Sequence, residues 1–267
     1  MEVQRFTASD GTPLVYWDVG ARDGVPLVLC HGLGAGAEQF TLDARFFAQH
    51  GFRVIAPDLR GHGASGVPQT GADAGYGLER LAQDQIDMLD HAGIDRAHWV
   101  GNSLGGIIGL TLVASHSGRF ASLSLFGTAL ALSLPRWTAA FMPAIDRFPG
   151  RGPMARMTAW STTRNRAARP LVEALLNRYD GAAVTAMIGH ITRYDLLAAA
   201  RAWAGPGLVM VGGRDRAVNR ALLGQLETLR RRPNWRIVDL PEGGHCANLD
   251  ATDLWRATLL AFWHDCP

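Results

Sequence analysis

The feature that most constrains the fold is the pentapeptide Gly101-Asn102-Ser103-Leu104-Gly105, which lies between a short apolar stretch and a long one. Residues 97–100 are apolar and partly β-branched, which is typical of a strand. Residues 106–114 are apolar almost without interruption, which indicates a buried helix. The glycines two positions either side of Ser103 leave room for a sharp turn that exposes the serine Oγ. The pattern therefore predicts a strand, a tight turn that carries a serine, and a helix.

Strands and helices alternate along most of the chain, which places it in the α/β class. The first two predicted strands, 3–7 and 13–19, are separated by a short turn and are expected to be antiparallel. The chain then alternates predicted strands and helices, the strands at 26–30, 53–56, 97–100, 120–126, 208–211 and 235–240 and the helices at 38–50, 78–92, 106–114, 217–231 and 254–263. Such alternation predicts right-handed crossovers and a mainly parallel sheet flanked by helices.

The alternation stops near Ala131 and resumes near Gly207. The intervening segment has a helical composition, several prolines and no convincing strand. We therefore predict one α/β core domain, formed by residues 1–131 and 207–267, with a helical cap inserted at 132–206.

Composition narrows the classes of partner. The formal net charge of +2 over 267 residues gives no reason to expect a nucleic-acid partner. The longest apolar stretches fall short of the roughly 20 residues that span a bilayer, so no membrane partner is expected. The residues Met1 to Phe6 show no signal-peptide pattern. Three cysteines, an odd number without metal-ligand spacing, suit a reducing compartment. We expect a cytoplasmic protein that has no metal site, and sequence leaves the oligomeric state open.

A serine becomes an effective nucleophile only when a base takes its proton and an acid orients that base. Asp215 follows the predicted strand 208–211 through a short turn, and His245 follows the strand 235–240 through a glycine-rich loop. Ligand sites form at the carboxyl ends of parallel strands, so these side chains can converge on Ser103. We predict a triad of Ser103, Asp215 and His245, although Asp215 could alternatively cap the helix that follows it.

Other histidines and acids fit the triad less well. They stand in predicted helices, before the turn, within a strand or at the terminus: His91, His116, His190, His98, Asp239 and His264.

Two further glycine-rich loops follow predicted strands. In His31-Gly32-Leu33-Gly34 the glycines allow the backbone N–H of Leu33 to turn toward the serine, where it and the N–H of Leu104 would form an oxyanion hole. His31 is interpreted as shaping this loop. The loop from Asp58 to Ser65 has neither a metal-ligand spacing nor the lysine of a phosphate-binding loop, and we interpret it as structural.

Together these motifs resemble the α/β-hydrolase superfamily over nearly the whole chain. The two loops look most like those of the 3-oxoadipate enol-lactonase and esterase-type group, and Gly101 to Gly106 also resembles the turn of meta-cleavage C–C hydrolases. The resemblance implies an eight-stranded, mainly parallel sheet, an inserted cap, and a triad in the chain order serine, acid, histidine. It also implies a cofactor-free reaction.

The predicted cap carries aromatic and methionine side chains that suit an apolar pocket, and we name Trp137, Phe141, Trp160 and Met187 as candidates for substrate binding. It also carries ten arginines against four acids. One of the arginines could bind a substrate carboxylate, although most are expected to lie in solvent.

The sequence thus favours a serine hydrolase that cleaves a small-molecule carboxylic ester or lactone through an acyl-enzyme. The expected substrate is apolar and could carry a carboxylate. The alternatives are a C–C bond hydrolase with the same triad and, from another class, a ligand-binding protein on a hydrolase scaffold.

Overall fold

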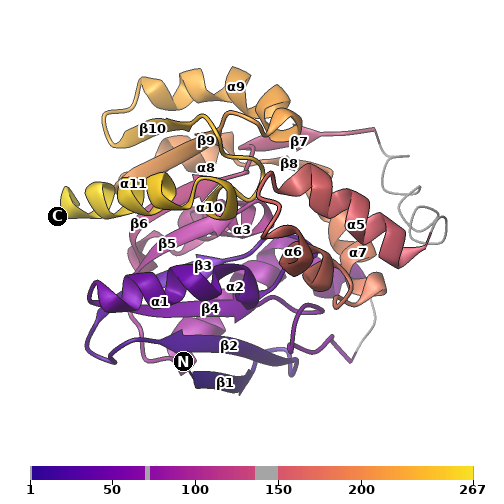
Figure 1. Cartoon of the computed structure of the whole chain (residues 1–267). Helices are drawn as coiled ribbons and strands as arrows, with labels where there is room; N and C mark the ends of the chain where they lie inside the picture. Colours follow the sequence, from indigo (N-terminus) through magenta and orange to yellow (C-terminus); the bar gives the residue numbers. More distant parts are fainter. Residues whose placement is uncertain (1, 70–72, 136–149, 267) are drawn as a thin grey trace.

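The computed structural model describes residues 2–69, 73–135 and 150–266. Its centre is an eight-stranded sheet in the order β1-β2-β4-β3-β5-β6-β9-β10 (Figure 1). All neighbouring strands pair in parallel except β1 with β2 and β2 with β4. The strands are β1 (Glu2–Thr7), β2 (Pro13–Val19), β3 (Val25–Cys30), β4 (Phe52–Asp58), β5 (Ala97–Asn102), β6 (Phe120–Phe126), β9 (Gly207–Gly212) and β10 (Trp235–Leu240). The predicted α/β class and mainly parallel sheet are confirmed.

Helices cover both faces of the sheet because its central strands are apolar on both sides. Strand β3 shows how this works: Leu27 and Leu29 pack with one core cluster, and Val28 and Cys30 pack with the other. The first face is covered by α1 (Thr41–Gln49) and α11 (Thr252–His264), and the second by α2 (Leu78–His91), α3 (Leu104–Ser115), α8 (Leu197–Ala202) and α9 (Arg216–Arg230). Short 3₁₀ helices η1 (Ala37–Phe40), η2 (Asp73–Tyr76) and η3 (Ser117–Arg119) and the one-turn α10 (Ala247–Asp250) complete this part of the chain.

The segment between β6 and β9 is mostly helical, with α5 (Arg151–Thr162), α6 (Arg169–Leu176) and α7 (Gly181–Ile191). In Figure 1, α5 and α6 lie over one end of the sheet. The segment also contains a two-stranded antiparallel sheet of β7 (Ala131–Ser133) and β8 (Arg193–Asp195). The sequence predicted no strand here, because three residues are too few to show alternation.

Helix α8, which the predicted cap at 132–206 includes, packs against α3 and α9. Ala200 of α8 and the following Trp203 are buried in the same cluster as α3 and α9. Directly after β8 the chain therefore returns to the layer of helices that covers the second face of the sheet.

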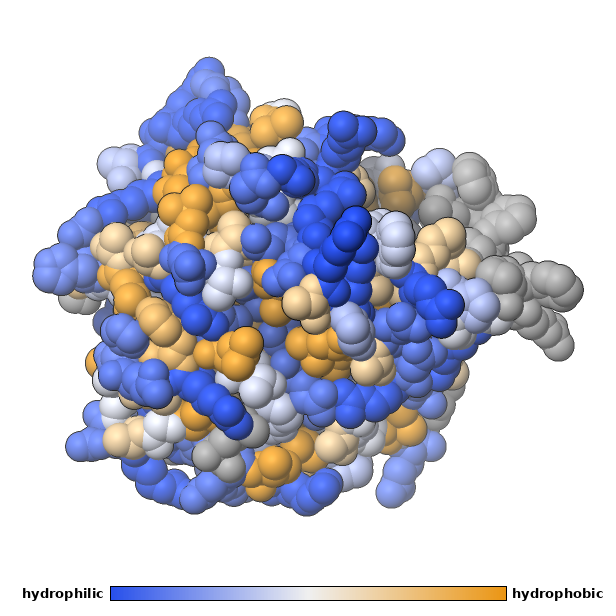
Figure 2. Space-filling model, in the orientation of Figure 1, coloured by the Kyte–Doolittle hydropathy of each residue, from blue (hydrophilic) through white to orange (hydrophobic). Residues whose placement is uncertain are grey.

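The surface in Figure 2 is largely hydrophilic, with apolar residues in small groups between the polar ones. None of the helices that the structure describes is both long enough and apolar enough to cross a membrane.

The turn between β5 and α3 is held by close backbone packing. A Cβ on Gly105 would lie 2.2 Å from the carbonyl oxygen of Cys30, and one on Gly101 would lie 2.4 Å from the carbonyl oxygen of Gly105. The helix therefore contacts β3 backbone to backbone, and only glycine fits at these two positions.

This packing predicts that Gly105→Ala is destabilising. We expect it to lower the free energy of unfolding by about 1–3 kcal/mol, since the new methyl group overpacks a rigid backbone contact. Chemical denaturation monitored by circular dichroism measures the change.

Gly189→Ala in α7 is the matched control. Gly189 is exposed, and nothing would lie within 4 Å of an added Cβ. Alanine should stabilise this helix by about 0.5–1 kcal/mol. Equal stability of the Gly105 and Gly189 variants would contradict the proposed packing constraint.

Candidate active site

Ser103 occupies a strained turn at the carboxyl edge of the sheet. Its φ is 51° and its ψ is −114°, and it is the one non-glycine residue with positive φ among those described. Its N–H donates to the carbonyl oxygen of Phe126 at 3.0 Å, and its own carbonyl accepts from Gly106 and Ile107 in the first turn of α3. Strain of this kind is maintained only when the surroundings fix it, and it is typical of functional sites.

Asp215 and His245 meet at the same edge of the sheet, from the loops after β9 and β10. Nδ1 of His245 lies 2.8 Å from Oδ2 of Asp215. A carboxylate can only accept, so the proton is on Nδ1 and Nε2 is left as the basic nitrogen. Asp215 is 6% exposed, and its other oxygen, Oδ1, accepts from the N–H of Val218. The carboxyl group therefore both caps α9 and orients His245, so the two interpretations of Asp215 from sequence are compatible.

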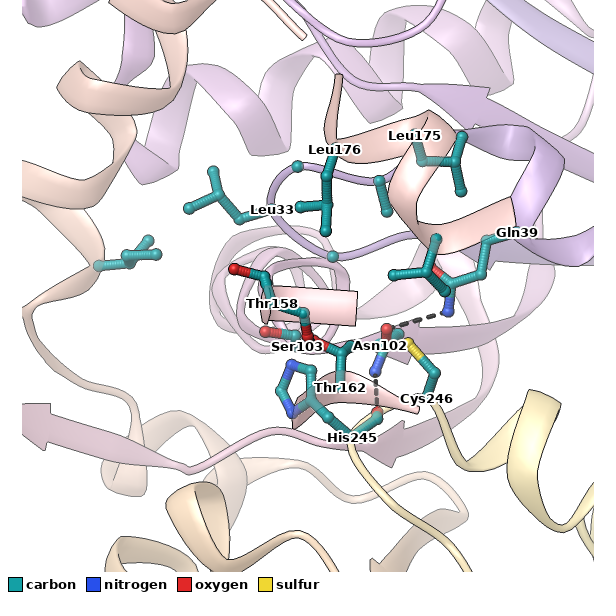
Figure 3. Close-up of a pocket in the computed structure, with 15 residues that line it drawn as sticks. Leu33, Gln39, Asn102, Ser103, Thr158, Thr162, Leu175, Leu176, His245 and Cys246 are labelled. Carbon is teal, nitrogen blue, oxygen red and sulfur yellow. Dashed lines mark hydrogen bonds between the residues drawn. The ribbon is translucent and has the colours of Figure 1, made fainter. Parts of the chain in front are cut away.

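Ser103 and His245 line one cavity together, and Figure 3 shows their side chains next to each other. The structure thus brings the predicted serine, acid and histidine to one place from three separate strand ends.

The loop at Leu33 lies directly against the serine. A Cβ on Gly32 would lie 3.1 Å from the Cβ of Ser103, so the loop backbone approaches the nucleophile closely. The N–H of Leu104 is at the first position of α3, where an N–H group has no acceptor within the helix. Leu33 and Leu104, the two residues predicted to supply the oxyanion hole, therefore both lie beside Ser103, and the dipole of α3 adds positive potential there.

Two buried histidines hold this loop. Nε2 of His31 accepts from the N–H of Leu59, and Nε2 of His62 accepts from the N–H of Gly34, each at 3.0 Å. Both Nδ1 atoms lie at hydrogen-bond distance from backbone carbonyls, to which they donate. Burial lowers the pKa of His31 to about 4 and that of His62 to about 3, so both rings are neutral at pH 7. His31 is structural, as the sequence indicated.

The loop from Asp58 to Ser65 is structural as well. Asp58 accepts from the N–H groups of Ala37 and Ala64. Arg60 is fully buried and forms a bidentate pair with Asp84 of α2, with both distances 2.6 Å. Among the described residues no cluster of histidine, cysteine, aspartate and glutamate could hold a metal ion.

Two cavities meet at Ser103 and share Leu33 and Ile191. The smaller, about 230 Å³, is lined by His245, by the polar residues Gln39, Asn102, Thr158 and Thr162, and over most of its wall by apolar side chains that include Val172, Leu175 and Leu176. The larger, about 470 Å³, is lined mainly by apolar side chains from α3, α7, α9 and β7: Ile107, Leu132, Ile188, Ala217, Val218 and Ala221. No aspartate, glutamate, lysine or arginine lines either cavity among the described residues.

Of the four predicted substrate-binding side chains, the two that the structure describes lie away from both cavities. Trp137 and Phe141 fall outside the described residues. Trp160 is 59% exposed, with the guanidinium of Arg169 over its ring at 4.3 Å. Met187 is fully buried in the main core. Neither Trp160 of α5 nor Met187 of α7 lines a cavity at Ser103, since the first side chain lies largely in solvent and the second packs in the core.

The described arginines of the predicted cap also lie away from both cavities. Arg156 pairs with Glu173, Arg178 pairs with Glu38, and Arg151 lies over the ring of Tyr179. This agrees with the solvated interpretation and gives no support to carboxylate binding by these residues.

Sequence reasoning missed a chain of buried amides behind the serine. Nδ2 of Asn102 donates to the carbonyl of His245 at 3.0 Å, and its Oδ1 accepts from Nε2 of Gln39 at 3.0 Å (Figure 3). Nε2 of Gln39 also donates to Asn248, which in turn donates to Asp43. The only sequence signal was the presence of Asn102 inside the serine pentapeptide.

Known proteins resemble this chain throughout its length. A family model described as the alpha/beta hydrolase fold matches residues 25–252. A protein of Variovorax paradoxus (strain S110) to which carbamate hydrolase activity is ascribed is 30% identical over 265 residues, and the match covers 94% of this chain and 96% of that protein.

Solved structures give the same result. A hydrolase from Pseudomonas aeruginosa is 26% identical with a TM-score of 0.86, covering 98% of both chains. The enol-lactonase from Burkholderia xenovorans LB400 is 24% identical with a TM-score of 0.85, covering 98% of this chain and 100% of that one. At 24% identity, the comparison with the enol-lactonase shows that the two proteins share a fold.

The two buried histidines predict that acid destabilises the protein. For His62 the unfolded chain has a pKa near 6.5 and the folded chain one of about 3. Between these values the unfolded state binds the extra proton, so stability falls as the pH falls. The slope from one such group is about 1.4 kcal/mol per pH unit.

His62→Gln removes this titration while keeping an acceptor for Gly34. Urea unfolding between about pH 6 and about pH 4.5 should give a pH slope shallower than that of the unmodified protein by about 1.4 kcal/mol per unit. Because other groups titrate equally in both proteins, the difference isolates His62. Identical slopes would refute the buried neutral state.

Proposed function

This chain belongs to the α/β-hydrolase family, and from that premise and the site geometry we propose that it is a serine hydrolase of carboxylic esters or lactones. The observation that carries the proposal is the 2.8 Å contact between His245 and Asp215, beside a serine on a positive-φ turn. The hydrolase relative from Variovorax paradoxus and the enol-lactonase fold support the same class of reaction.

The first half of the reaction forms an acyl-enzyme. Oγ of Ser103 attacks the substrate carbonyl while Nε2 of His245 takes the hydroxyl proton. Asp215 is acceptor-only and buried, so it stabilises the imidazolium and keeps the ring oriented. The negative charge that develops on the carbonyl oxygen is stabilised by the N–H groups of Leu33 and Leu104, which are positioned before the reaction begins.

The second half repeats the steps with water. His245 protonates the departing alkoxide, which leaves Nε2 free to take a proton from water. The resulting hydroxide attacks the acyl carbonyl, and the Ser103 oxygen recovers its proton from His245. These residues supply every proton transfer, so the proposed reaction proceeds without a cofactor, and a small-molecule ester or lactone is the one partner that it requires.

This mechanism predicts the loss of activity in Ser103→Ala. Turnover of p-nitrophenyl butyrate should fall by about 10⁴-fold or more, because the nucleophile of the acyl-enzyme is gone. Asp215→Asn should cost about 10⁴-fold, since an amide favours the wrong tautomer of His245. The control is Ser117→Ala. Ser117 is exposed and follows the end of α3 opposite to Ser103, so this variant should keep full activity.

A fluorophosphonate probe separates an enzyme from a binding protein on the same scaffold. The unmodified protein and Ser117→Ala should be labelled, and Ser103→Ala should not. Hydrolysis that persists in Ser103→Ala, or labelling at another serine, would overturn the proposed function.

A further inference from the structure

The residues on either side of His245 are attached to two different parts of the chain. The N–H of Gly244 donates to Oδ2 of Asp250, at the end of α10, at 2.7 Å. The N–H of Cys246 donates to the carbonyl oxygen of Thr162, the last residue of α5, at 3.2 Å. The backbone at His245 is therefore held both by α10 and by the end of α5.

The side chain of Asp250 joins these two attachments. Its Oδ1 accepts from the hydroxyl of Thr163 and from the backbone N–H groups of Arg164 at 2.8 Å and Asn165 at 3.1 Å. Its Oδ2 is left for Gly244, and a carboxylate can use both oxygens in this way because it only accepts. One half-buried side chain thus links the residues that follow α5 to the loop of the proposed base.

The backbones at this link are packed closely. A Cβ on Gly244 would lie 2.5 Å from Oδ2 of Asp250 and 3.2 Å from the carbonyl oxygen of Thr162. Nδ2 of Asn165 adds a hydrogen bond to the carbonyl oxygen of Leu249 at 2.9 Å. Glycine-rich backbone has wide conformational freedom of its own, so contacts of this kind are needed to fix the position of the loop.

The same end of α5 also forms part of the wall of the smaller cavity. Thr158 and Thr162 line that cavity together with His245 (Figure 3). Asp250 and Thr163 are absent from the described lining of both cavities. Any effect of these two side chains on the reaction must therefore pass through the position of the loop.

We propose that Asp250 is a positioning residue for the proposed general base. It holds the backbone at Gly244 against the residues that follow α5, so that Nε2 of His245 stays within reach of Ser103 and of the leaving group. The inference rests on the proposed function, because it concerns the proton transfers of His245. Helix α5 then contributes to the reaction through the base as well as through the cavity wall.

Asp250→Asn tests the link while keeping the size of the side chain. The three donors that follow α5 require an oxygen, so the amide oxygen should stay with them and Nδ2 should face the N–H of Gly244. Two donors form no hydrogen bond, so the attachment of the loop is lost. Proton transfer depends on that attachment, and a misplacement of about 1 Å can cost about 100-fold in rate.

Two aryl esters of nearly equal shape report the position of His245. The phenolate released from p-nitrophenyl butyrate is weakly basic and leaves without a proton, whereas the phenolate of p-methylphenyl butyrate is more basic and leaves more readily when His245 protonates it. We expect Asp250→Asn to lower kcat/KM by about 10-fold for the first ester and about 100-fold for the second. The ratio of the two kcat/KM values should therefore rise by about 10-fold.

Three further variants serve as tests and control. Thr163→Val removes one donor to Asp250 without a change of charge, and it should raise the ratio by about 3-fold or more, as the loss of one hydrogen bond allows. In the double variant the ratio should equal that of Asp250→Asn alone, because the residues after α5 no longer reach the loop. Asp253→Asn makes the same substitution at an exposed site on α11 and should leave the ratio unchanged.

The outcomes separate the two proposals. Rates are expressed per serine titrated to completion with a fluorophosphonate, so partial unfolding of a variant does not alter the ratio. An unchanged ratio in Asp250→Asn or in Thr163→Val, even where both rates fall together, would overturn this inference in an active enzyme. An unmodified protein that hydrolyses neither ester and is not labelled would instead overturn the proposed function.

Discussion

The structure depends on one constraint, the backbone crossing of α3 over the end of β3. At Gly105 the two backbones come so close that a methyl group would lie 2.2 Å from the carbonyl oxygen of Cys30. Ser103, which connects the strand to this helix, has a φ of 51° in the sharp turn between them. The cost of the strained residue, of order 1–3 kcal/mol, is offset by the packing of an almost wholly apolar helix. The same crossing brings the Leu33 loop against the serine.

The parts of the site that sequence predicted are those set by local patterns at strand ends. A β-strand followed by a glycine-rich turn places its next polar residue at the sheet's carboxyl edge, so Ser103, Asp215 and His245 could be located before any geometry was known. The mainly parallel sheet could also be predicted from local patterns, because short strands such as 97–100 and 208–211 alternate with helices along the chain. What sequence could not supply was the rotational register of the cap helices. Trp160 and Met187 have the composition of pocket residues, yet one stacks under Arg169 in solvent and the other packs in the core.

The buried amides explain how a histidine on a flexible loop stays in place. Asp215 fixes the ring of His245, but the loop 241–245 is rich in glycine and would allow the backbone to move. Asn102 prevents this by donating to the carbonyl of His245, and it is itself held by Gln39 and by the carbonyl of Phe126. The residue before the nucleophile therefore connects the two halves of the site. Buried networks of this kind are stable only when nearly every group is paired, so the paired amides of Asn102, Gln39 and Asn248 give this part of the site its rigidity.

The lining of the two cavities bears on selectivity. An apolar cavity distinguishes substrates that differ by a methylene only weakly, by about 1–3 kcal/mol, whereas a buried polar atom rejects a substrate that leaves it unpaired far more strongly. Along the described lining of both cavities there is no aspartate, glutamate, lysine or arginine, so neutral polar groups and the shape of the apolar walls are left to select the substrate.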